Sequence, residues 1–154
     1  MKGSRKIPSR REPEIIGWRE VVALPDLGIA EVRAKIDTGA RTSALHAKHI
    51  ETFERDGVSH VRFHVPASRR HRAFKIETPV HDERAIKNTS GIPESRIVVK
   101  TLLILGRHRW VVDVSLANRE QMEFDLILGR TALRGRRLLV HPGRSFVAGS
   151  PHVE

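Results

Sequence analysis

A carboxylate followed by small and polar residues stands at the end of an alternating stretch of the chain. In Ile29–Ile36 apolar and charged side chains alternate, and the stretch runs directly into Asp37-Thr38-Gly39-Ala40. Such alternation is the period of a half-buried strand, so a rigid strand would deliver Asp37 to the first position of a tight turn. There Thr38 can hydrogen-bond locally, and Gly39 can adopt backbone conformations closed to other residues. The segment presents a carboxylate that either does chemistry or only caps its own turn.

Three further segments follow in a fixed order. They are Ile86-Lys87-Asn88-Thr89-Ser90-Gly91, then Phe124–Arg130, whose terminal Leu-Gly-Arg continues as Leu128–Leu133, and finally Val140-His141-Pro142-Gly143-Arg144-Ser145-Phe146. Together with the Asp37 turn, these segments resemble the retropepsin-like aspartic peptidases. Within that group they resemble the bacterial and archaeal branch often labelled "ATP-dependent zinc protease". The resemblance covers residues 17–148.

The resemblance implies both a fold and a reaction. The fold is all-β, a retropepsin-like closed β-barrel with one short helix, and the catalytic turn consists of Asp37, Thr38 and Gly39. An aspartic peptidase holds two carboxylates so close that both cannot ionise; one keeps a proton while the other deprotonates the attacking water. This sequence has one such motif. We therefore expect a two-fold homodimer in which Asp37 meets its symmetry mate.

The same branch includes a hydrolase of poly-glutamate tails, encoded beside an ATP-grasp glutamate ligase that adds such tails to a ribosomal protein. The resemblance thus implies an aspartic endopeptidase that acts on acidic, poly-glutamate chains. The implied partners are a second copy of the chain, a glutamate-rich polypeptide such as a ribosomal protein tail, and an ATP-grasp ligase as a functional associate.

Other site residues are expected around the catalytic turn and in residues 81–95, where the family places its flap. Arg41 is the strongest candidate to bind a substrate carboxylate, because a guanidinium pairs with a carboxylate in a bidentate fork. Gly129 and Arg130 are expected to be structural, the glycine by allowing close packing under the site and the arginine by bracing the loop or dimer. The expected substrate-binding residues are Ala40, Arg41, Thr42, Arg84, Lys87, Ser90 and Gly91.

The remaining pattern predicts the elements that position this site. Gly106-Arg107 is predicted to connect a hairpin, Asn118–Met122 to be a loop and Thr131–Arg136 a short helix. We expect one domain at 15–148, between a basic, disordered tail at 1–14 and a C-terminal tail at 149–154. The predicted strands are 17–24, 29–36, 58–65, 95–105, 108–116, 124–128, 138–140 and 145–148.

Composition limits the alternatives. The chain has 28 Lys and Arg against 18 Asp and Glu, a formal charge of +10, which attracts polyanions in general. It has no cysteine, no His-Glu-x-x-His and no glycine-rich nucleotide loop, so we expect no metal and no cofactor. The N-terminus lacks the apolar segment of a secretory signal or anchor, and no stretch is long enough to span a bilayer. The predicted location is the cytoplasm, with no membrane partner.

The charge also fits functions without catalysis. A basic β-domain could bind nucleic acid or an acidic tail without cutting it, or regulate an ATP-grasp ligase. Five Phe, two Trp and no Tyr argue against a base-stacking surface.

Overall fold

The computed structural model of this chain describes residues 12–69, 71–88, 90–118 and 123–153. The predicted disorder of the N-terminal tail falls mainly on residues 1–11, and the predicted loop 118–122 falls mainly on 119–122, which lie outside these ranges. The described elements are β1 (Glu14–Leu24), η1 (Pro25–Leu27), β2 (Ile29–Ile36), β3 (Ser43–His46), β4 (Lys48–Arg55), β5 (Val58–Val65), β6 (Phe74–Pro79), β7 (Asp82–Lys87), β8 (Pro93–Leu105), β9 (His108–Ala117), β10 (Leu126–Leu128), α1 (Arg130–Leu133) and β11 (Leu138–Ser145).

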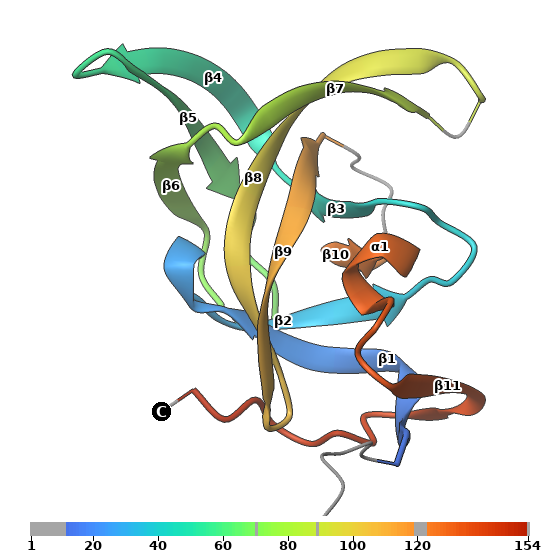
Figure 1. The fold of residues 1–154 in the computed structure, drawn as a ribbon. Coiled ribbons are helices and arrows are strands. Elements are labelled where there is room, and N and C mark those ends of the chain that lie inside the picture. The colour runs from blue at the N-terminus through green and yellow to red at the C-terminus, as the bar shows by residue number, and fades with distance from the viewer. Residues whose placement is uncertain (1–11, 70, 89, 119–122, 154) are drawn as a thin grey trace, which may run out of the picture.

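Most strands belong to one strongly curved sheet of order β11-β1-β2-β10-β3-β9-β8-β7. Strand β1 also pairs with β8 through Ala23 and Ile104. This pairing closes a ring of strands in the order β1-β2-β10-β3-β9-β8 (Figure 1). The prediction of a mostly β fold with one short helix is confirmed.

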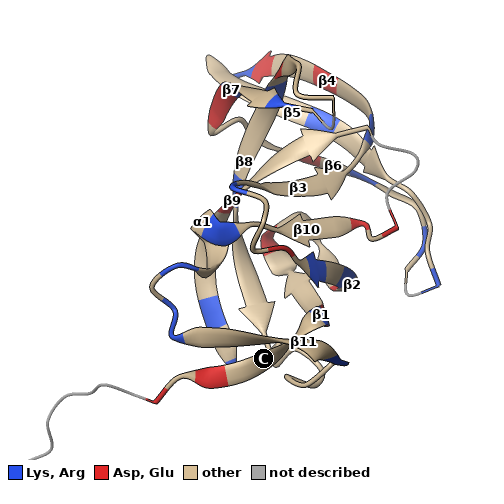
Figure 2. Ribbon diagram, turned by 90° about the vertical axis from the view of Figure 1, so that its right-hand side faces the viewer, with Lys and Arg blue, Asp and Glu red and all other residues tan. Residues whose placement is uncertain are grey.

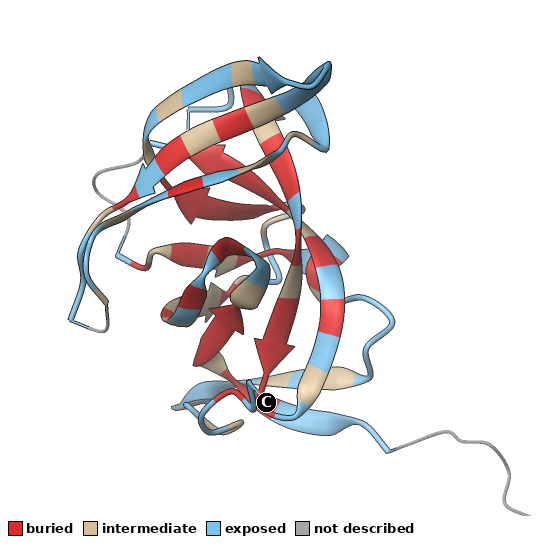
Figure 3. Ribbon diagram, turned by 90° about the vertical axis from the view of Figure 1, so that its left-hand side faces the viewer, coloured by how far each residue is buried: buried red, intermediate tan, exposed pale blue. Residues whose placement is uncertain are grey.

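A second sheet, β4-β5-β6, packs its apolar face onto the interior of the first. Strand β5 contributes Val61, Phe63 and Val65 to the same buried cluster as Leu45, Leu103 and Leu126 of the large sheet. Figure 3 shows buried and exposed positions alternating along many strands. Each such strand has one face in the core and one in solvent, as a period of two requires.

Strand β2 owes its position to the same alternation. Its buried residues Val32, Ala34 and Ile36 face the core while Arg33 and Lys35 are half-exposed. It lies between β1, which is antiparallel to it, and β10, which is parallel to it with Leu128 opposite Ile36. The strand that ends at Asp37 is therefore held on both edges.

Several predicted boundaries were wrong. The segments 138–140 and 145–148 were predicted as two strands, but β11 runs continuously over Leu138–Ser145. Its register with β1 shifts between Gly17 and Arg19, so the pairing stays interrupted opposite Pro142 and Gly143. Strand β10 is shorter than predicted and α1 begins at Arg130. Strands β3, β4 and β6 were not predicted, and β7 was predicted only as part of the flap segment.

Glu20 is a fully buried carboxylate that joins β1 to the C-terminal segment. Its Oε2 accepts the backbone N–H groups of Gly17 at 2.6 Å and Val147 at 2.9 Å, and its Oε1 accepts that of Ala148 at 3.1 Å. A buried carboxylate can remain when several donors satisfy its oxygens.

We expect Glu20→Gln to lower the free energy of unfolding by about 1–3 kcal/mol, because the new amide places N–H donors against backbone donors. Urea denaturation followed by tryptophan fluorescence would measure the change. Glu54→Gln, at an exposed position of β4, removes the same charge and should leave the denaturation midpoint nearly unchanged. Equal midpoints for both variants would contradict a structural role for Glu20.

Lys and Arg positions are spread over both sheets and α1 (Figure 2). None of the helices in the described ranges is long and apolar enough to cross a membrane.

Candidate active site

Asp37 directly follows β2, and its backbone is fixed by the neighbouring strand. Its N–H donates to the carbonyl of Leu128 in β10 at 2.9 Å. Its Oδ1 accepts the N–H groups of Gly39 at 3.0 Å and Ala40 at 3.2 Å. The turn therefore orients the carboxylate through one oxygen, while Oδ2 has no hydrogen-bond partner in the described part of the chain.

Gly39 serves this turn through its small size. Its φ is not in the left-handed region, in contrast to the special conformation considered from the sequence. A Cβ at Gly39 would lie 3.3 Å from Asp37 Oδ1, which is a tight contact. The glycine leaves room for the carboxylate to fold back onto the backbone.

The segment after β10 packs directly beneath the Asp37 turn. A Cβ at Gly129 would lie 2.6 Å from the carbonyl oxygen of Thr42, so only glycine fits without a backbone shift. Arg130 donates its N–H to the carbonyl of Ala40 at 2.8 Å and its Nη1 to the carbonyl of Thr38 at 2.9 Å. One arginine thus ties two residues of the turn to the start of α1.

Ser43 and Ser115 extend this support. Ser43 Oγ accepts the Gly129 N–H at 3.0 Å, and Ser115 Oγ donates to the Ser43 carbonyl at 2.8 Å. On α1, Thr131 donates its Oγ1 to the carbonyl of Arg41 at 2.9 Å. Strands β3, β9 and β10 and helix α1 therefore fix the course of the chain after Asp37.

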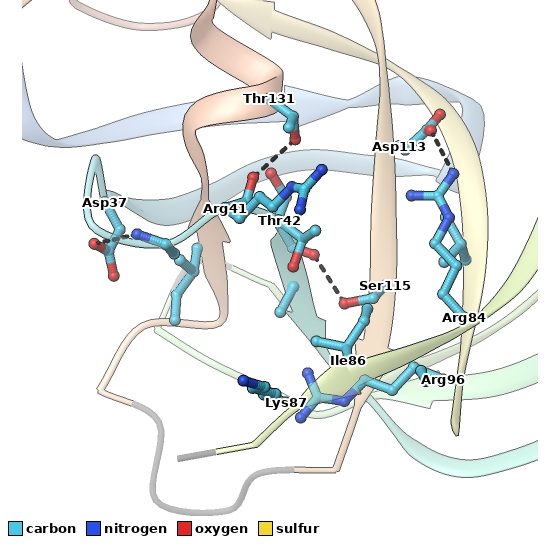
Figure 4. Close-up of a pocket in the computed structure, with 16 residues that line it drawn as sticks. Asp37, Arg41, Thr42, Arg84, Ile86, Lys87, Arg96, Asp113, Ser115 and Thr131 are labelled. Atoms are coloured by element: carbon cyan, nitrogen blue, oxygen red, sulfur yellow. Dashed lines mark hydrogen bonds and ion pairs between the residues drawn. The ribbon is translucent and has the colours of Figure 1, made fainter. Parts of the chain in front are cut away.

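A cavity of about 910 Å³ opens between the Asp37 turn and the hairpin of β7 and β8. Figure 4 shows the arrangement, with Asp37 at one side and the side chains of β7 and β8 at the other. Predicted site residues that line it are Asp37, Ala40, Arg41, Thr42, Arg84 and Lys87. Predicted residues outside its lining are Thr38, Gly39, Ser90, Gly91, Gly129 and Arg130.

The hairpin of β7 and β8 coincides with the segment predicted as a flap. At its tip, Asn88 Oδ1 accepts the N–H groups of Ser90 at 2.9 Å and Ile92 at 3.0 Å. Gly91 has a φ of 78°, a left-handed conformation that favours glycine. These contacts orient Ser90 and Gly91, which do not line the cavity.

Arg84 reaches the cavity but is already engaged by two carboxylates. Its Nε donates to Asp82 Oδ2 at 2.7 Å and its Nη2 to Asp113 Oδ2 at 3.2 Å. The hydrogen bond from Arg84 lowers the pKa of Asp82, and the same bond raises the pKa of Arg84. Asp113 also lies 3.7 Å from Lys100 Nζ and 3.8 Å from His81 Nε2. This cluster joins β7, β8 and β9 at the base of the hairpin.

Arg41 and Lys87 differ from Arg84 in this respect. Both are exposed, and neither side chain forms an ion pair with any residue that the structure describes. Among the cavity-lining cations, these two have a charge that no described residue pairs with, and we call it uncommitted charge.

The cavity contains polar residues that sequence reasoning missed, namely Ser43, Arg96, Asp113, Ser115 and Thr131. The sequence held one usable signal for them. Pairing outward from the predicted Gly106 turn places Lys100 opposite Asp113, as observed. The same alternation along β8 puts Arg96 on the face of Val98, another residue of the cavity lining.

Across the described ranges, no three His, Asp or Glu side chains are grouped so that they could hold a metal ion.

This chain is similar to known proteins in sequence and in fold. The family model RimB-like, described as retropepsin-like aspartic endopeptidase RimB, matches residues 15–151. A probable alpha-L-glutamate ligase of Desulfotalea psychrophila is 41% identical over 143 residues, which are 92% of this chain and 31% of that protein. Another of the same name from Parasynechococcus marenigrum is 40% identical over 137 residues, 88% of this chain and 29% of that protein. The label "ATP-dependent zinc protease" is not among these names.

The chain thus spans less than a third of the length of these curated relatives. A crystal structure of a Legionella pneumophila protein of unknown function matches with a TM-score of 0.73 at 30% identity. It covers 88% of this chain and 98% of the other. Since the family model matches nearly the whole described domain, this chain belongs to the RimB-like family of retropepsin-like aspartic endopeptidases.

Proposed function

We propose that this protein is an aspartic endopeptidase that hydrolyses peptide bonds in acidic, glutamate-rich chains. The observation that carries the proposal is the position of Asp37 at the wall of a cavity that also contains Arg41 and Lys87. The turn holds the carboxylate by backbone hydrogen bonds, as a catalytic group requires. Family membership supports the same reaction class.

The proposed reaction uses two copies of Asp37, one from each chain of a homodimer. Two neighbouring carboxylates share one proton, because like charges at short range cannot both ionise. The ionised carboxylate removes a proton from water as the water attacks the peptide carbonyl, and the protonated one donates a hydrogen bond to the carbonyl oxygen. The C–N bond then breaks as the carboxyl group that took the proton from water gives it to the leaving amine. Thr38 and Gly39, exposed at the tip of the turn, would meet the same turn of the partner chain.

The acidic substrate is proposed from charge and from the relatives. Arg41 and Lys87 offer uncommitted positive charge, and both are suited to carboxylates. The relatives are named probable alpha-L-glutamate ligases, so this domain accompanies an enzyme named for joining glutamate. A peptidase that trims the chains such a ligase makes fits that association, and a tailed ribosomal protein in the cytoplasm is the proposed natural substrate.

The relatives' names also favour a second candidate function. A domain that occupies less than a third of a ligase could hold the growing acidic tail, or regulate the ligase, without cutting. The two functions differ in whether product fragments appear when the pure chain meets its substrate.

The deciding experiment incubates the pure protein with poly-L-glutamate, without nucleotide or added metal, and measures chain length by gel or mass spectrometry. Poly-L-lysine, single-stranded RNA and casein serve as parallel substrates. Cleavage of poly-L-glutamate alone supports the proposal. Tight binding of poly-L-glutamate without cleavage, under conditions in which the protein is dimeric, would instead favour the second candidate function, in which the domain holds the acidic tail without cutting it.

Removing the uncommitted cations should weaken substrate binding. We expect Arg41→Ala and Lys87→Ala each to raise KM for poly-L-glutamate about three- to tenfold, with a smaller effect on kcat, because each contact is charge-assisted. The dependence of KM on salt should also flatten, since exposed charges are screened over about 8–10 Å.

Lys75→Ala is the matched control, because Lys75 is exposed on β6 and does not line the cavity. It removes the same charge and should leave KM nearly unchanged. Equal KM values for all three variants would show that net charge, and not these two side chains, attracts the substrate.

A further inference from the structure

Two arginines lie directly opposite each other in the hairpin that borders the cavity. Arg84 of β7 pairs in register with Arg96 of β8, and both line the cavity. Like charges directly opposite on a sheet destabilise it unless each is compensated. Arg84 is compensated by Asp82 and Asp113. Arg96 is compensated less fully.

Arg96 is a buried cation with one carboxylate partner in the described part of the chain. Its side chain is only 6% exposed, whereas that of Glu94 is 45% exposed. Both Nε and Nη2 donate to the same oxygen, Glu94 Oε1, at 3.2 and 3.1 Å. Nη1 has no hydrogen-bond partner among the described residues. Because Nη1 is not one of the buried atoms without a partner, and Arg96 lines the cavity, its N–H groups give this guanidinium the capacity to bind a second carboxylate.

Glu94 lies between this cation and the tip of the hairpin. Its Oε2 accepts from Asn88 Nδ2 at 3.3 Å while its Oε1 accepts from Arg96. In Figure 4 the Arg96 side chain extends along the cavity toward the end of Lys87. An acidic side chain that entered the cavity would therefore meet Arg96 with Glu94 already beside it.

We propose that Arg96 determines specificity by binding a side-chain carboxylate of the substrate, and that Glu94 occupies the same guanidinium in the free protein. This inference rests on the proposed function. A substrate glutamate carries the same carboxylate on the same stem as Glu94, so it can replace the two bonds and add one to Nη1. Glu94 acts as an internal competitor that disfavours entry of chains without acidic side chains.

The test removes the competitor and leaves the cation in place. We expect Glu94→Gln to lower the Kd for an oligo-glutamate peptide, and KM for poly-L-glutamate, about three- to tenfold, with kcat nearly unchanged. The matched control is Glu83→Gln. Glu83 is an exposed residue of β7 that does not line the cavity and accepts from Ser95 Oγ. It removes the same charge from the same hairpin, so general attraction of a polyanion would appear equally in both variants.

Arg96→Lys completes the test, because it keeps the charge but cannot form the fork of bonds. It should raise Kd and KM about tenfold, and adding Glu94→Gln to it should then gain little. Circular dichroism and thermal denaturation would verify that each variant is folded. If Arg96→Lys fails to fold, Glu94→Gln still tests the proposal, because Glu94 is half-exposed and its substitution should not disturb the fold.

Binding is measured by calorimetry on the Asp37→Asn background, so that it does not depend on turnover. If poly-L-glutamate binds but is not cut by the parent protein, the proposed function fails while the calorimetry still decides the role of Arg96. Equal Kd values for parent, Glu94→Gln and Glu83→Gln would overturn the inference even if cleavage occurs. No binding by the parent protein would overturn both.

Discussion

Asp37→Asn should abolish hydrolysis of poly-L-glutamate, with a loss of at least about a thousandfold in kcat, while the protein remains folded. The amide cannot accept a proton from water at neutral pH, so the general base is lost. The fold should survive, because an asparagine Oδ1 can still accept the N–H groups of Gly39 and Ala40. Substrate binding should change little, since the cavity's cations are retained.

The measurement compares kcat, Kd for an oligo-glutamate peptide and melting temperature between parent and variant. Asp56→Asn is the matched control: Asp56 occupies the turn between β4 and β5 with a φ of 53°, which asparagine also tolerates. It should keep full activity. Substantial turnover by purified Asp37→Asn would exclude Asp37 as the general base of the reaction.

The sequence predicted those strands whose two faces differ. Ile29–Ile36 and Val58–Val65 were predicted with the boundaries that the structure gives, and both alternate between core and solvent. Two of the missed strands, β3 and β4, lack that signal, whereas β6 alternates in the same way and was missed all the same. Strand β3 is buried at all four positions, so it shows no alternation, and β4 is mostly exposed. Their pairing partners, β9 and β10 for β3 and β5 for β4, identify them as strands.

The site residues also fall into those that the sequence predicted and those that it did not. Asp37, Ala40, Arg41 and Thr42 belong to one short segment of the sequence, so a single motif placed them at one wall of the cavity. Arg96 and Asp113 reach that cavity through the register of β7, β8 and β9. The sequence also did not show which arginines are free to bind a substrate carboxylate. By residue type Arg84 is as suitable as Arg41, but in the structure Arg84 is paired with Asp82 and Asp113.

Mixing the parent protein with excess Asp37→Asn should inhibit the parent protein, because it forms inactive mixed dimers. The proposed site needs one Asp37 from each chain, so a mixed dimer has a single competent carboxylate. With nine parts of variant to one of parent, random pairing leaves about one parent chain in ten with a parent partner. Activity per parent chain should then fall about tenfold once subunits have exchanged. Specific activity of the parent alone should also fall on dilution, as dimers dissociate.

The exposed Thr38 and Gly39 at the tip of the turn are consistent with this expectation, because a second copy can reach them. Subunit exchange is followed by native mass spectrometry with an isotope-labelled variant, and substrate is kept in large excess so that its binding to the variant does not matter. A sample assayed immediately after mixing, before exchange, serves as the control and should show no loss. If mixed dimers form and activity per parent chain stays constant, one chain suffices for catalysis. The second carboxylate would then have to come from the same chain, and Asp113 would be the first residue to test, because it already lies in the cavity with Asp37.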